Sequence, residues 1–208
     1  MNRRTDRDLP GNLIVVQKEH VSGRFTYGSI GWFDASTIGN ARAFASYWAN
    51  PRYKAFGNSQ AFQITTVIGP FDRQSRVTFS IDQYNRTTQV SGTIRNYDIA
   101  ADRNLPRVRN GYEQGMAGKP HRGVNDDGGH LIGARFGGAA EAFNLVAMGK
   151  GINRGSFNQF EKEMSRLVSN GSVRFDMSIS YSGSAARPNG FVAAYDAGRR
   201  KISFARTQ

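Results

Sequence analysis

Three side chains in the second half of the chain have the types and spacing of a hydrolytic site. His130 follows a Gly-Gly pair, Asn153 comes later, and Glu161 follows Asn153 by eight residues. An imidazole has a pKa of about 6.5, so its neutral form can accept a proton from water near neutral pH. An amide oxygen is a hard, neutral ligand of the kind that Mg²⁺ accepts. These residues therefore indicate a general base beside a divalent cation.

Phosphodiester hydrolysis is a reaction that these residue types could perform. It needs a base for water, positive charge against the phosphate, and stabilisation of the leaving oxygen. Because Mg²⁺ keeps most of its waters, the single ligand Asn153 can suffice. In an α-helix, eight residues rise by about 12 Å. Glu161 is therefore expected to hydrogen-bond the water around the ion and not the ion itself.

Each of these residues also has an ordinary structural interpretation. His130 could be a histidine beside a turn, Asn153 a helix N-cap, and Glu161 a solvated glutamate. Asn144 stands among apolar residues, and it could orient the His130 ring or brace a strand end or loop. The adjacent acids at 126–127 are expected to form a turn or to pair with arginines, and not to bind the metal.

Arginines near these residues are candidates for phosphate contact, because a guanidinium binds two phosphate oxygens at once. Arg135 is the candidate at the reaction centre. Arg109, Arg122 and Arg154 are the candidates for binding the nucleic-acid backbone. The stretch 102–124 is rich in Arg, Lys and Gly and poor in apolar residues, and we expect a long basic loop that holds backbone phosphates.

The elements that position these residues are predicted by hydrophobic periodicity. Alternating or β-branched runs predict strands at 13–16, 61–68, 76–81, 90–94, 173–181, 191–195 and 201–204, with strands and turns over 24–33. Helical spacing predicts helices at 40–48 and 156–168. The expected fold class is α+β, with an antiparallel sheet and few helices.

The composition narrows the classes of partner and site. The chain has 28 Lys and Arg against 16 Asp and Glu, which gives a net charge of +12. This charge favours nucleic acid as the binding partner, with an anionic membrane surface as the second choice. It has no cysteine, which excludes disulfides, thiolate metal sites and cysteine nucleophiles. Its three histidines, at 20, 121 and 130, lack metal-ligand spacing, which argues against a zinc hydrolase. No window approaches the roughly 20 apolar residues of a membrane span.

The segment 125–164 resembles the DNA/RNA non-specific endonucleases, which are ββα-metal (His-Me finger) nucleases. Within them it is similar to the branch found as C-terminal domains of secreted bacterial polymorphic toxins. The resemblance is carried by Asp126-Asp127-Gly128-Gly129-His130-Leu131-Ile132, Phe136-Gly137-Gly138, Asn144-Leu145-Val146-Ala147-Met148, and Asn153-Arg154-Gly155 followed by Glu161. It extends more weakly over 76–204, and residues 1–70 match nothing that we can name.

The resemblance implies specific roles. His130 would be the general base, Asn153 the single direct Mg²⁺ ligand, and Glu161 the residue that holds the ion's water. The finger would comprise a strand at 130–136, a strand at 143–148 and a helix at 156–168. Gly128 stands where the best-known branch has an arginine, so the arginine that clamps phosphate must come from elsewhere. Ala147 stands where the family usually has proline.

The expected function is a Mg²⁺-dependent endonuclease that cuts DNA, with RNA as a second substrate and Mn²⁺ as a substitute metal. As the toxic effector domain of a bacterial toxin, it would leave the cell by a non-classical secretion route, since residues 1–10 do not form a signal peptide. It would act in the target-cell cytoplasm without inserting into a membrane, and an acidic immunity or inhibitor protein would restrain it.

The expected domain division is an N-terminal extension of strands and one short helix at 1–75, followed by the nuclease domain at 76–208. The alternative function is a basic nucleic-acid-binding module without catalytic activity. Such a module would bind with a steep salt dependence and would not cleave with any divalent ion.

Overall fold

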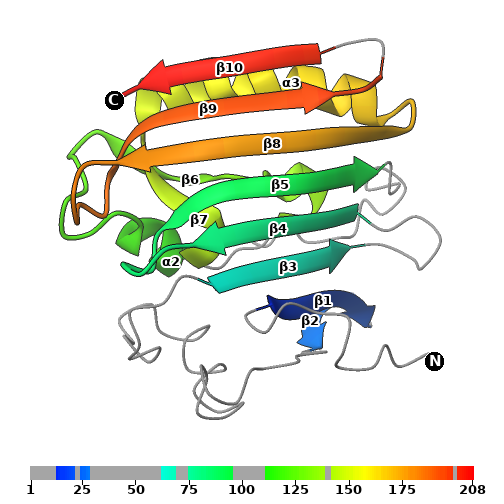
Figure 1. Ribbon diagram of the computed structural model, residues 1–208, viewed down its shortest axis with the longest axis horizontal. Coiled ribbons are helices and arrows are strands. Elements are labelled where there is room, and N and C mark those ends of the chain that lie inside the picture. The colour runs from blue at the N-terminus through cyan, green and yellow to red at the C-terminus, as the bar shows by residue number, and fades with distance from the viewer. Residues whose placement is uncertain are drawn as a thin grey trace.

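Strands form most of the structure, a computed structural model in which residues 75–95, 111–138, 142–198 and 201–208 are described with their side chains. For three earlier strands only the backbone is described. One eight-stranded sheet has the order β10-β9-β8-β5-β4-β3-β1-β2 (Figure 1). Its strands are β1 (Leu13–Val21), β2 (Arg24–Gly28), β3 (Phe62–Ile68), β4 (Ser75–Ile81), β5 (Thr87–Arg95), β8 (Ser172–Tyr181), β9 (Pro188–Asp196) and β10 (Lys201–Thr207).

Alternating side chains give this sheet one apolar face. In β8, Val173, Phe175, Met177 and Ile179 are buried while the residues between them are exposed, as expected for a strand with one face in the core. Helix α3 (Phe157–Val168) lies behind the sheet in Figure 1 and packs against this face. Its Phe160 ring lies 4.9 Å from the Tyr195 ring of β9, between centroids. The core therefore lies between the sheet and this helix.

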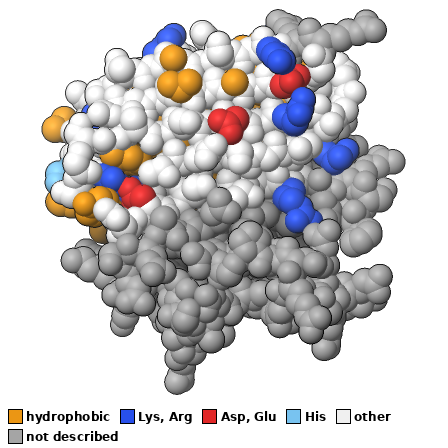
Figure 2. All heavy atoms as spheres, viewed as in Figure 1, with side chains coloured by type: hydrophobic (Ala, Val, Ile, Leu, Met, Phe, Trp, Pro, Cys, Tyr) orange, Lys and Arg blue, Asp and Glu red, His pale blue; other side chains and the backbone are white. Residues whose placement is uncertain are grey.

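The opposite face of the sheet carries mostly small and polar side chains. Figure 2 shows this face, with Lys and Arg gathered mainly toward its right-hand edge. Arg76 of β4 and Arg174 of β8 both pair in register with Thr93 of β5, so these three residues form a row across the sheet. The catalytic candidates are on the other side, among the elements behind the sheet.

A second, two-stranded sheet joins β6 (Asp126–His130) to β7 (Leu145–Gly149). The other elements behind the large sheet are α2 (Gly111–Met116), 3-10 turns at Ala134–Phe136 and Ala142–Asn144, and a π-helical turn at Ile152–Ser156 that runs directly into α3. The two strands and α3 form the expected ββα arrangement, although their bounds differ from the prediction.

The strand predicted at 130–136 is wrong, because β6 ends at His130 and the chain then leaves the ladder. The buried Asn144 side chain replaces a strand partner for Ile132. It donates Nδ2 to the Ile132 oxygen over 2.9 Å and accepts the Ile132 N–H at Oδ1 over 2.8 Å. A 3-10 turn follows and closes at Gly137, whose φ of 75° is in the left-handed region. Asn144 therefore braces the segment after His130.

The remaining predicted elements are confirmed with small shifts where the structure describes them. The predicted strands of the large sheet are all present, and the hairpin at 76–95 is formed by β4 and β5. The strand predicted at 143–148 is β7, and the helix predicted at 156–168 is α3. Every neighbouring pair among the strands is antiparallel except β1 and β3, which are parallel.

Two predictions reach outside the described residues. The helix predicted at 40–48 lies outside them, as does much of the basic stretch at 102–124. Over 111–116 the prediction of a loop is wrong, because α2 forms there. None of the helices in the described ranges is long and apolar enough to cross a membrane.

Candidate active site

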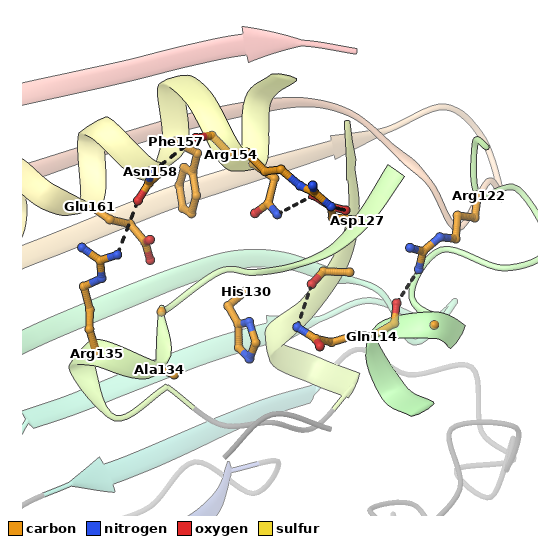
Figure 3. Close-up of a pocket in the computed structure, with 14 residues that line it drawn as sticks. Gln114, Arg122, Asp127, His130, Ala134, Arg135, Arg154, Phe157, Asn158 and Glu161 are labelled. Atoms are coloured by element: carbon orange, nitrogen blue, oxygen red, sulfur yellow. Dashed lines mark hydrogen bonds and ion pairs between the residues drawn. The ribbon is translucent and has the colours of Figure 1, made fainter. Parts of the chain in front are cut away.

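The three residues singled out for chemistry line one cavity of about 550 Å³. His130 comes from the end of β6 and Glu161 from α3 (Figure 3). Asn153 comes from the π-helical turn. Arg122, Arg135 and Arg154 line the same cavity. The fold thus gathers in one place residues that are separated along the chain.

Asn153 is not a helix N-cap, because Lys150 and Gly151 before it are already helical. In an unbroken α-helix, residues eight apart are rotated by about 80° from one another. The π-helical turn at Ile152–Ser156 has hydrogen bonds that span one more residue, so it rotates the chain less per residue. This difference brings Asn153 nearer to the face of the helix that carries Glu161.

The Asn153 amide is held by Asp127 of β6. Asn153 donates Nδ2 to Asp127 Oδ2 over 3.0 Å. Arg154 donates Nε to the same oxygen and Nη2 to Oδ1, each over 2.7 Å. The hydrogen bond from Arg154 lowers the pKa of Asp127 to about 2, which partial burial opposes and the Asn153 bond assists. Of the two interpretations of this acid, pairing with an arginine is confirmed, and the turn is wrong because Asp127 lies in β6.

The Gly128-Gly129 pair makes room for protein groups. A Cβ at Gly128 would lie 2.3 Å from the backbone oxygen of Gln114 in α2. A Cβ at Gly129 would lie 2.9 Å from the Met148 Cβ and 3.1 Å from Oδ1 of Asn153. The pair therefore lets α2 and the Asn153 amide approach β6 closely.

The position of the Glu161 carboxylate depends on another glycine, Gly133. A Cβ at Gly133 would lie 2.2 Å from Oε1 of Glu161, so the carboxylate occupies the space above the bare Gly133 backbone. The neighbouring Arg135 donates Nη2 to Oδ1 of Asn158 over 3.4 Å, and in Figure 3 it points toward the same end of α3 as Glu161. Residues 133–135 thus form the wall of the cavity that faces α3.

The four candidate phosphate-binding arginines differ in how the protein uses them. The Arg154 side chain is 68% exposed, and its guanidinium pairs with Asp127. Arg122 donates to the backbone oxygens of Gln114 and Asp126, so its guanidinium ties α2 to β6. Arg109 lies outside the described residues. Arg135 and Arg154 are therefore the candidates best placed to contact phosphate.

Asn144 and Asp126 support the site from outside the cavity. Neither is among the residues that line it. Asp126 is buried and pairs with Arg187 through two hydrogen bonds of 2.7 and 3.0 Å. This pair joins the start of β6 to the segment between β8 and β9. Hydrogen bonding from Arg187 lowers the pKa of Asp126, against the effect of burial.

The oxygen atoms at the cavity fit a hard divalent cation. The amide oxygen of Asn153 lies on the Gly129 side, next to His130 in sequence, and the Glu161 carboxylate lines the same cavity. Within the described residues, no three His, Cys, Asp or Glu side chains gather in a way that could hold a metal. These donors suit an ion such as Mg²⁺, which takes most of its ligands from water.

Comparison with known proteins identifies the family. A family model described as DNA/RNA non-specific endonuclease matches residues 68–198, more than half of the chain. The chain belongs to the DNA/RNA non-specific endonuclease family. Membership agrees with the resemblance seen in the sequence, which is strong over 125–164 and weaker over 76–204.

A secretion system protein and one solved nuclease structure are similar to this chain. Type VII secretion system protein EssD of Staphylococcus aureus, in strains USA300 and NCTC 8325 / PS 47, is 38% identical over 102 residues. The match covers 45% of this chain and only 17% of each relative. The solved structure of Sda1 nuclease with bound zinc ion has a TM-score of 0.48 and 14% identity, covering 75% of this chain and 86% of that chain.

Some residues at the cavity carried little signal in the sequence. Gln114 and Gly115 belong to a short helix in a stretch that reads as a loop. Gly133 has no feature that separates it from the many other glycines of the chain. Asn158 and Phe157 read as part of an ordinary amphipathic helix, and only the packing shows that they line the cavity.

Proposed function

We propose that this protein is an endonuclease that hydrolyses the phosphodiester bonds of DNA, and of RNA, with one divalent cation. The observation that carries the proposal is that His130, Asn153 and Glu161, from three different elements, line a single cavity. Mg²⁺ is the proposed ion and Mn²⁺ its substitute, because both accept oxygen ligands. Family membership supports the reaction class.

The proposed mechanism assigns each side chain one task. His130, in its neutral form, takes a proton from the attacking water. The Asn153 oxygen would hold the cation, and Glu161 would orient water beside it. The cation, when bound, supplies positive charge against the phosphate and the leaving oxygen. Arg135 and Arg154 pair with phosphate oxygens. Since phosphate contacts carry little base information, cleavage is expected to be largely independent of sequence.

We further propose that the chain is the toxic effector part of a secreted bacterial protein. The match to the type VII secretion system protein EssD supports this proposal. The protein would be exported by a non-classical route, act in the cytoplasm of a target cell, and be restrained by an acidic inhibitor protein. Expression inside a bacterial host should then lower viability, and H130A should restore it.

Cleavage of supercoiled plasmid and of RNA tests the activity. The purified chain is incubated with each substrate in EDTA, Mg²⁺ or Mn²⁺, beside H130A, N153A and H121A. The wild type and H121A, a control at an exposed histidine that does not line this cavity, should cut both substrates with either metal. H130A should lose about 10²–10⁴-fold in rate. Wild-type binding without cleavage in any divalent ion would instead support a non-catalytic nucleic-acid-binding module.

A further inference from the structure

We infer that Asp127 is a positioning residue, which fixes the Asn153 side chain so that its oxygen, and not its nitrogen, faces the cation. This inference rests on the proposed function, because it takes Asn153 as the protein ligand of that cation. It assigns a task to an acid that the proposed mechanism does not use. Asp127 lies in β6, three residues before His130.

A single amide ligand presents a problem of orientation. The oxygen and the NH₂ group of an asparagine side chain have nearly the same shape, and rotation about the last bond exchanges them. Only the oxygen can bind a cation, because the NH₂ group is a donor. A site with one protein ligand therefore loses that ligand whenever the amide flips.

The geometry of Asp127 prevents that flip. Its Oδ2 lies 3.0 Å from Nδ2 of Asn153. A carboxylate only accepts hydrogen bonds, so the flipped amide would place oxygen against oxygen. With the NH₂ group held by Asp127, the Asn153 oxygen lies on the Gly129 side, 3.1 Å from the position of a Cβ there. The absence of a side chain at Gly129 is what leaves room for this orientation.

Arg154 holds the carboxylate in place. Its guanidinium donates to both oxygens of Asp127 over 2.7 Å, and the Asp127 side chain is only 17% exposed. Asp127 thus accepts three hydrogen bonds from two consecutive residues of the π-helical turn. Arg154 also offsets the negative charge, so the carboxylate acts on the site through the orientation of Asn153 and less through its charge.

Mn²⁺ binding to the full chain, measured without nucleic acid by the electron paramagnetic resonance signal of free Mn²⁺, tests the inference. The variants are N153A, D127A and D127N. An asparagine at 127 has the shape of the aspartate and can keep an oxygen at the Oδ2 position, where both Asn153 and Arg154 donate, but it has no charge, and its NH₂ group loses the hydrogen bond from Arg154 Nη2. We expect D127A to weaken Mn²⁺ binding by about 10–100-fold, and D127N to stay within roughly threefold of the wild type.

Different outcomes would overturn the proposed metal site and the positioning role of Asp127. If N153A binds Mn²⁺ as the wild type does, the proposed metal site is wrong. If N153A loses binding while D127A keeps it, the function stands and the positioning role is overturned. If D127N binds as weakly as D127A although its Asn153 NH₂ protons stay protected from exchange, charge and not orientation is responsible, which also overturns the role.

A measurement on the wild type covers the case in which D127A fails to fold. The Asn153 NH₂ protons should exchange with solvent more slowly than those of the exposed Asn125, because only the former are hydrogen-bonded to a carboxylate. D127N should retain part of this protection. Equal exchange at Asn153 and Asn125 in the wild type would show that Asp127 does not hold the amide.

Discussion

The size of the side chain at position 133 determines where the Glu161 carboxylate can lie. In G133A the new Cβ would meet Glu161 Oε1 at 2.2 Å, and the flexible glutamate would have to move. We expect the rate of plasmid cleavage to fall by about 10–100-fold, as for other losses of a group that orients metal-bound ligands, with little change in thermal unfolding.

Gly151 provides the matched control for this prediction. It is helical and precedes the π-helical turn, and a Cβ there would meet nothing within 4 Å. G151A should therefore cleave as the wild type does and should be more stable by up to about 1 kcal/mol, as alanine is in a helix. If G133A also cleaves at the wild-type rate, the position of Glu161 does not matter for the reaction.

The chemistry of individual residues could be predicted from the sequence more readily than the neighbouring residues that hold them in place. His130, Asn153 and Glu161 were identified from residue type and spacing, and the structure brings all three to one cavity. The use of the glycines could not be predicted, because it depends on what packs above them. Gly128 accommodates the backbone of Gln114, which belongs to a helix that the sequence does not indicate.

At the scale of elements, the π-helical turn sets the angle between the metal ligand and the glutamate. Deleting Gly155 removes one residue from the turn at Ile152–Ser156 and should convert it to regular α-helix. Asn153 and Glu161 would then be seven residues apart in a regular α-helix and only about 20° from one another, so Asn153 should stay on the face that carries Glu161. We expect Mn²⁺ binding and cleavage to be largely retained, together with the helical circular dichroism signal.

The substitution G155A is the control for this deletion. A Cβ at Gly155 would meet nothing within 4 Å, so the turn can keep its length and its course. G155A should bind Mn²⁺ and cleave as the wild type does. Loss of Mn²⁺ binding in the deletion variant, while G155A binds, would mean that the extra residue of the turn, and not the shared helix face, determines the position of Asn153.

The Asp126–Arg187 pair anchors β6 to the segment between β8 and β9, and its loss should destabilise the fold in a pH-dependent way. The Asp126 side chain is 2% exposed and the Arg187 side chain 27%. In R187A a buried carboxylate loses its partner, and we expect a loss of about 3 kcal/mol near neutral pH. Urea unfolding at several pH values measures this loss.

The sign of the pH dependence follows from the lowered pKa of Asp126 in the folded state. A carboxyl group with a lowered pKa contributes stability above its unfolded pKa, about 3.9, and this contribution is lost as the pH falls through the folded value. The difference between wild type and R187A should therefore shrink below about pH 4. R174A, which removes an exposed pair with Asp196, should cost less than about 1 kcal/mol at any pH. A constant difference for R187A across this range would exclude the pair as its cause.

The hydrophobic pattern predicted the elements of the large sheet better than those around the cavity. Strands such as β8 alternate over their whole length, so one buried face defines them. The segment after His130 is apolar and reads as a strand, but the Asn144 side chain ends the ladder at that point. Such a hydrogen bond joins residues twelve apart, and no local pattern shows it.

At the scale of the whole molecule, the net charge of +12 should make binding to nucleic acid strong at low salt and independent of sequence. Two contacts to phosphate, by Arg135 and Arg154 at the cavity, predict a roughly tenfold fall in affinity between 50 and 200 mM salt. Titration of two unrelated DNA duplexes with H130A in EDTA measures this. The double variant R135A/R154A should lower the salt slope by about 2. A tenfold preference for one duplex would contradict backbone-directed binding.

The proposed reaction depends most on the His130 ring and the cation at Asn153 sharing one cavity. The chain has three histidines, so their ring protons can be assigned by proton NMR and followed as Mn²⁺ is added below one equivalent. The paramagnetic ion should broaden the His130 signal before that of His121, which does not line this cavity, and N153A should abolish the difference. Equal broadening of both rings, or a sharp His130 signal when Mn²⁺ is bound, would contradict the proposed site.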